Sequence, residues 1–130
     1  MLSRSLAALT LATLAVAPAT ARADSAGKTG RITKLEIVSK GSTDAAKYRG
    51  SIQVRRGKDR PEVYHWGGGY CTGKDLTDGQ IDLLMHALER NGRIKITPRF
   101  RNGQAGKRCL VGFTLHRVSP NKKKSGGDHD

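Results

Sequence analysis

The chain has few of the residues that build metal centres, aromatic cores or membrane spans. Its 130 residues include two cysteines, one tryptophan, three tyrosines and two phenylalanines. The cysteines and histidines lack the C-x-x-C or H-x-x-x-H spacing of common metal sites, so the sequence indicates no metal ligands. Beyond residue 23, no segment is apolar over the roughly 20 residues that cross a bilayer, which argues against a membrane-spanning helix there. No internal repeat is visible, and we expect no cofactor.

Acidic residues are also scarce. The chain has 11 Asp and Glu against 24 Lys and Arg, a formal net charge of +13. Residues 1–23 hold two of the basic residues, Arg4 and Arg22, and no acid, so the rest of the chain carries a net charge of +11. A charge of this size favours association with anionic partners, although it does not select one of them.

The first 23 residues have the features of an export signal. Arg4 provides a positive start, an apolar run rich in Ala and Leu follows, and Ala21-Arg22-Ala23 is a small-x-small cleavage site. We predict a signal peptide over 1–23, a single domain over 24–118 and a disordered basic and polar tail over 119–130. The protein is therefore expected to be periplasmic or secreted.

Hydrophobic periodicity predicts one helix between two groups of strands. Thr77 and Gln80 form a capping box, and Asn91-Gly92 ends the helix. The apolar residues at helical spacing are Ile81, Leu84, Met85 and Leu88. Alternation of apolar and polar residues predicts strands over 31–39, 48–56, 61–66, 93–101 and 107–118. The expected fold is α+β, an antiparallel sheet of about five strands in the order β-β-β-α-β-β with the helix packed on one face, preceded by a loose segment over 24–30.

The two cysteines, Cys71 and Cys109, are expected to form a disulfide. An even pair in an exported chain is more often a cystine than two free thiols. Closing a loop of this length would stabilise the fold by roughly 4 kcal/mol in the loop-entropy model, which matters for a domain of this size.

Residues 68–75, GGYCTGKD, resemble a phosphate-binding loop at three positions. Gly68, Gly73 and Lys74 match the G-x-x-x-x-G-K pattern, but Asp75 replaces the hydroxyl residue that would hold magnesium. The helix also begins four residues after Lys74, at Asp78, so its amino end would not face a phosphate held by the loop. We interpret the glycines as turn residues.

The main functional hypothesis is electrostatic. Strand alternation places six cations outward: Arg49, Arg55, Arg93, Lys95, Arg99 and Arg101. Several acids lie on or beside the helix, so the uncovered face of the sheet is expected to be positive. This face would engage an anionic partner, which could be a nucleic acid, an anionic polysaccharide or an acidic protein. The alternative is that these residues only solvate a polar outer face.

Three aromatic residues, Tyr64, Trp66 and Tyr70, lie within seven positions. Beside a basic face they could stack on bases or sugars. Equally, they could fill the core and cover the disulfide.

Two other functions fit the sequence. The chain could be a protein–protein interaction or inhibitor module of the bacterial envelope, selecting an acidic partner. It could also be a small secreted ribonuclease-like phosphodiesterase, for which Glu62, His65 and His116 have suitable acid–base chemistry. No catalytic residue is assigned, because the sequence reveals no site geometry.

Overall fold

The computed structural model describes residues 24–90 and 92–119, together with Ala12. The expected signal peptide, apart from Ala12, and the expected tail, apart from Ser119, lie outside the described residues. The elements in chain order are β1 (Ser25–Ala26), β2 (Arg31–Ile37), the 3-10 turn η1 (Thr43–Ala46), β3 (Gly50–Arg55), β4 (Glu62–Trp66), α1 (Asp78–Glu89), β5 (Ile94–Asn102), the 3-10 turn η2 (Gln104–Gly106) and β6 (Arg108–Arg117).

One six-stranded sheet contains all the strands, in the order β1-β5-β6-β4-β3-β2. The pairs β2–β3, β3–β4, β5–β6 and β1–β5 are antiparallel. β4 and β6 are parallel and meet at one register pair, His65 opposite Cys109. The expected α+β class with one helix is confirmed, while the sheet is mixed rather than wholly antiparallel.

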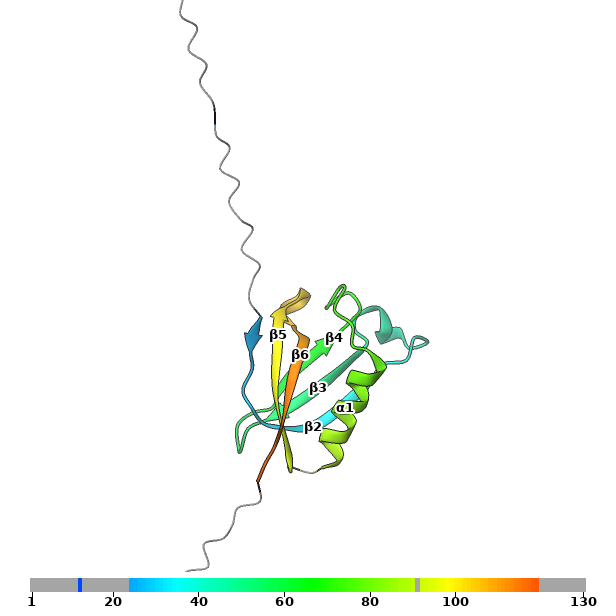
Figure 1. Cartoon of the computed structure of the whole chain (residues 1–130). Helices are drawn as coiled ribbons and strands as arrows, with labels where there is room; N and C mark the ends of the chain where they lie inside the picture. The colour runs from blue at the N-terminus through cyan, green and yellow to red at the C-terminus, as the bar shows by residue number, and fades with distance from the viewer. Residues whose placement is uncertain (1–11, 13–23, 91, 120–130) are drawn as a thin grey trace, which may run out of the picture.

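The two ends of this sheet belong to one continuous stretch of chain, so the sheet closes on itself. The N–H of Gly27 donates to the carbonyl of Pro98, and Gly30 pairs with Ile96 of β5. A few residues later the same segment pairs with β3, where Leu35 lies opposite Ile52. Figure 1 shows this path, from β1 beside β5 to β2 below β3. The result is a small barrel with the connectivity of the OB-fold, a five-stranded Greek-key barrel, in which β1 and β2 together form the first strand.

The helix α1 begins as the capping box predicts. The Thr77 hydroxyl accepts from the Gln80 N–H, and the Gln80 side chain accepts from the Thr77 N–H. The helix contacts β2 and β5, and it buries Leu84 and Ala87 against the barrel. The expectation that Met85 faces inward is wrong, because this side chain is 44% exposed and the small Ala87 takes the inner position.

The barrel interior holds the core. Tyr64, Trp66, Ile52, Ile96 and Leu110 are almost fully buried there. Leu110 is buried, although Thr114 and His116, the later even-numbered residues of its strand, are exposed. An irregularity in register between β5 and β6 gives β6 an extra residue near position 111, and this reverses the alternation for Leu110.

Residues 24–30 form more than a loose lead-in, since they supply β1 and the pairing with β5. The disulfide is present, with Cys71 and Cys109 sulfurs bonded as predicted. Within the described part of the chain, no helix is both long enough and apolar enough to cross a membrane.

Candidate functional site

The structure separates the six cations that strand alternation places outward. Arg93, Lys95, Arg99 and Arg101 lie on β5 or just before it, whereas Arg49 and Arg55 lie at opposite ends of β3. β5 and β3 are separated in the sheet by β6 and β4, and the sheet is curved. The six cations therefore lie on or beside two strands that are not neighbours in the sheet.

Three of the six are engaged by neighbouring groups. Arg101 Nε donates to Asp24 Oδ1 at 2.5 Å. The guanidinium of Arg99 lies over Gly112, since a Cβ there would fall 2.8 Å from Arg99 Nη2. The aliphatic part of Arg49 packs against Gly67, close to the carboxylate of Asp75. These residues are poor candidates for a shared anion site.

Two of the remaining three, Arg55 and Lys95, belong to a row of like charges across three strands. Arg31 of β2 lies directly opposite Arg55 of β3. On its other side, the bridge between Gly30 and Ile96 places Arg31 beside Lys95 of β5. All three alternate with buried residues, so their side chains point away from the barrel interior. We call Arg55, Arg31 and Lys95 the cation row.

The cation row has few counter-charges. The only ion pairs within the described ranges are Lys28–Asp59, Lys34–Glu36, Arg101–Asp24 and Arg108–Glu62, none of which involves the row. The Nε of Arg55 is buried without a hydrogen-bond partner among the described residues. Like charges directly opposite each other destabilise a sheet. The fold therefore tolerates an unfavourable arrangement here.

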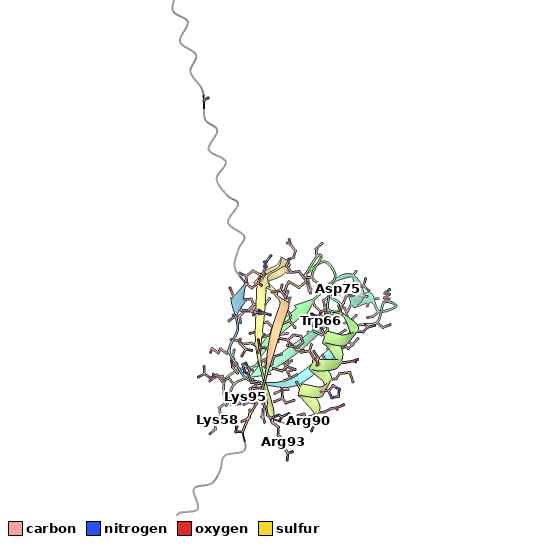
Figure 2. All side chains as sticks on the ribbon, viewed as in Figure 1. Lys58, Trp66, Asp75, Arg90, Arg93 and Lys95 are labelled. Atoms are coloured by element: carbon pink, nitrogen blue, oxygen red, sulfur yellow. A yellow bond between two sulfur atoms is a disulfide. The ribbon has the colours of Figure 1, made fainter. Side chains whose placement is uncertain are left out.

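Further cations surround the row at the same end of the barrel. Arg56, Lys58 and Arg60 lie in the turn between β3 and β4. Figure 2 shows Lys58, Lys95, Arg90 and Arg93 toward one end of the molecule, while Asp75 lies toward the other. We call the end that carries the cation row the basic end.

The proposed stacking role of Tyr64 and Trp66 is wrong. Their side chains are 0% and 1% exposed, and Figure 2 shows Trp66 in the interior. Their strand parity directs both rings into the barrel, where they belong to the same core cluster as Ile52 and Leu84. Only Tyr70 of the three reaches the surface, and it is half-buried.

Tyr70 belongs to a small cluster that four segments assemble. Its ring stacks on Tyr48 at 6.0 Å, and His65 of β4 approaches both rings edge-on, at 5.9 Å from Tyr70 and 4.9 Å from Tyr48. The ammonium of Lys107 lies 5.4 Å from the Tyr70 ring centre. The Tyr48 hydroxyl donates to Glu36 Oε1 at 2.5 Å. The Tyr70 ring thus contacts both Tyr48 and Lys107.

Backbone hydrogen bonds hold these segments together. The N–H of Tyr70 donates to the Lys47 carbonyl, and the N–H of Gln104 donates to the Tyr70 carbonyl. Gly68 makes the first contact possible, because it has a φ of +62° and a Cβ there would lie 2.6 Å from the Lys47 backbone. The Cys71–Cys109 disulfide adds a covalent link between the same loop and β6. The cluster is consequently preorganised.

The loop that resembles a phosphate-binding motif uses its own amides internally. The N–H groups of Gly67, Gly69, Cys71 and Lys74 donate to backbone carbonyls of this loop or of residue 46. A phosphate loop needs such groups free to face the anion. Together with the helix start at Asp78, this geometry supports the turn interpretation.

A groove opens where the parallel strands diverge from their one register pair. Its volume is about 300 Å³, and it is lined by Glu62, Val63, His65, Gly106, Lys107 and Arg108. Glu62 Oε2 accepts from the Tyr64 hydroxyl at 2.6 Å and lies 3.3 Å from Arg108 Nη1. We call this feature the β4–β6 groove.

The groove and the cluster perturb the titration of three groups. The hydrogen bond from Tyr64 lowers the pKa of Glu62, with a further contribution from Arg108. Burial lowers the pKa of His65, and the nearby Lys107 charge lowers it further, so this imidazole is neutral at neutral pH. The hydrogen bond to Glu36 raises the pKa of Tyr48 to about 12.

The residues of the phosphodiesterase hypothesis do not converge. His116 forms a hydrogen bond with Thr97 and lies opposite Lys95 of β5. His65 lies opposite Cys109 of β6, and Cys109 is seven residues before His116 on that strand. At about 3.3 Å per residue, the two histidines are on the order of 20 Å apart. Only Glu62 and His65 share a site. Among residues 24–90 and 92–119, no group of three potential metal ligands is present.

Sequence reasoning missed Arg31, Tyr48 and Lys107. Arg31 is an outward residue at the start of a strand, and Tyr48 and Lys107 lie in loops. Such positions indicate a site only when the strand register and the loop contacts are known. Comparisons of the chain with protein-family models, with curated proteins and with solved structures find no match.

Proposed function

We propose that this protein binds an anionic polymer across the basic end of the barrel, along the cation row. The observation that carries the proposal is the alignment of Arg55, Arg31 and Lys95 on adjacent strands without a carboxylate partner among the described residues. Adjacent strands are about 4.8 Å apart, so the row presents charges at short intervals across the strand direction. A polymer with repeated negative groups relieves this repulsion when it binds.

The architecture supports this proposal by analogy. Barrels of this connectivity often bind oligonucleotides or oligosaccharides on the face of their second and third strands, which correspond to β3 and β4 here. Such an analogy does not assign a function by itself. It agrees with the position of Arg55 on β3 and of the β4–β6 groove beside β4.

We also propose that the protein is exported. Residues 1–23 supply the signal features, and the cystine is a bond that persists in oxidising compartments. The partner would then be an anionic polymer outside the cytoplasm.

Heparin chromatography tests the proposal. Replacing Arg31, Arg55 and Lys95 together with glutamine should move elution to much lower salt, because these side chains are the contacts. Replacing Lys40, Lys47 and Arg99 with glutamine removes the same charge elsewhere on the surface and should change elution little. Equal shifts for the two triple variants would mean that only net charge matters, and the proposal would then be wrong.

The inhibitor or interaction-module function is the remaining alternative. An acidic protein partner would meet the same basic end, so salt dependence does not distinguish it. Competition with heparin distinguishes the two kinds of partner. If an acidic protein from an envelope extract binds and heparin fails to displace it, the partner is not an anionic polymer.

A further inference from the structure

The β4–β6 groove lies directly beside the cation row. Arg55 follows Val54, and Val54 lies opposite Glu62 at the start of β4. The Arg55 end of the row is therefore close along the sheet to Glu62, the first groove residue of β4. The groove has a different chemistry from the row, because it combines positive groups with a carboxylate and an apolar surface.

The positive side of the groove comes from Lys107 and Arg108. Arg108 Nη1 lies 3.3 Å from Glu62 Oε2, and its guanidinium lies 4.9 Å over the Phe100 ring. Lys107 lies near the Tyr70 ring and has no carboxylate partner among the described residues, so its charge is available to a ligand. His65 adds a neutral ring whose Nδ1 is buried and has no hydrogen-bond partner among the described residues. One anionic substituent can be held here.

The acceptor side of the groove comes from Glu62. Its contacts with Tyr64 and Arg108 both use Oε2, which leaves Oε1 for a donor from a ligand. Val63 is 37% exposed and supplies an apolar wall. Sugar hydroxyls donate to carboxylates, and the C–H face of a sugar ring packs on apolar side chains. A phosphodiester group has no hydroxyl to donate to Glu62 Oε1 and no C–H ring face to pack on Val63.

The aromatic rings also disfavour a nucleobase. Bases in single-strand binders stack on free ring faces. Here Tyr48 and Tyr70 stack on each other, so each ring already uses one face on the other.

We propose that the β4–β6 groove binds one acidic sugar residue, a hexose ring carrying a carboxylate, so that the anionic polymer is an acidic polysaccharide. This inference rests on the proposed function, and it adds the identity of the polymer. Lys107 holds the sugar carboxylate, Glu62 Oε1 accepts from ring hydroxyls, and Val63 packs on the ring. The volume of about 300 Å³ is at the lower end for ligand pockets and suits a single ring.

Titration calorimetry with three small probes tests the inference. The probes are trigalacturonate, its fully methyl-esterified neutral form, and a thymidine tetranucleotide with three phosphodiesters. Trigalacturonate should bind at least about 10-fold more tightly than either of the others, which is the value of one charge-assisted hydrogen bond. Lys107→Gln should weaken trigalacturonate binding by about 10-fold, while the matched variant Lys40→Gln should change it less than about twofold.

The outcomes separate this inference from the proposed function. If the tetranucleotide or the neutral ester binds as tightly as trigalacturonate, or if Lys107→Gln binds like wild type, the groove does not recognise acidic sugars. Binding of an anionic polymer along the cation row would still be supported in that case, provided that the triple variant of the row loses heparin retention. If that variant keeps its retention, the proposed function fails independently of the groove.

Discussion

Removing one charge from the cation row should stabilise the protein while it weakens binding. Arg31 lies between Arg55 and Lys95, so the Arg31→Gln variant removes two unfavourable cross-strand neighbours at once. Arg31 is exposed, which makes the loss of packing small. Arg55 is less suitable for this test because its Nε is buried.

The strand geometry sets the size of the expected change in the free energy of unfolding. Directly opposed like charges cost roughly 0.2–1 kcal/mol relative to neutral pairs. We expect Arg31→Gln to raise the free energy of unfolding by about 0.5 kcal/mol at low salt, which corresponds to a rise in Tm of roughly 2–4 °C for a domain of this size. The Debye length falls to about 3 Å at 1 M salt, shorter than the distance between strands, so the gain should vanish there.

Urea unfolding of wild type and of Arg31→Gln, at low salt and in 1 M NaCl, measures this effect. Lys40→Gln serves as the control for a general loss of positive charge, since Lys40 lies in the loop between β2 and β3, at the other end of β2 from Arg31. If Arg31→Gln lowers the free energy of unfolding, or raises it only as much as the control does, charge repulsion within the row does not destabilise the fold.

Three further predictions concern the loops and the groove. Replacing Cys71 and Cys109 with serine removes a cross-link over 38 residues and should lower the free energy of unfolding by about 4 kcal/mol in the loop-entropy model, measured by urea unfolding. The depressed pKa of His65 means that the unfolded chain binds its proton more readily, so stability should be full above about pH 6.5 and should fall as the pH drops below it. A Tm series from pH 5 to pH 8 should show a weaker decline in His65→Gln, and an unchanged decline would exclude His65 as the cause. Gly68→Ala places a Cβ 2.6 Å from the Lys47 backbone at a φ of +62°, and should lower stability by roughly 1–3 kcal/mol in thermal unfolding, whereas Gly73→Ala, with a positive φ but open space, should cost less.

Local signals in the sequence were sufficient for the helix and for most strand positions. The capping box at Thr77 fixes the start of α1 because its two hydrogen bonds join residues three apart. The inward face was less predictable. Met85 fits the helical period, but the barrel wall approaches the helix where the small Ala87 lies.

Long-range pairing could not be predicted. Ser25 and Ala26 have no strand-like alternation, and they form β1 only because β5 offers an edge. The parallel meeting of His65 with Cys109 joins residues 44 positions apart. Without these pairings, the sequence did not show that the sheet closes, and all six outward cations were assigned to its uncovered face.

The candidate site shows the same limit. Alternation identified Arg55 and Lys95 as outward residues, but it did not show that Arg31 lies between them. Tyr64 was correctly placed in a strand, but the sequence did not show which side of that strand faces the core. The sequence shows the types of the candidate residues, but it does not show which of them lie close together in space.

Chemical-shift mapping by NMR tests the cation row most directly. During titration with a heparin-derived hexasaccharide, the largest shifts should fall on Arg31, Arg55 and Lys95 and continue to Lys107. Largest shifts on Arg99 and Arg101, or an even scatter over the surface, would contradict the account.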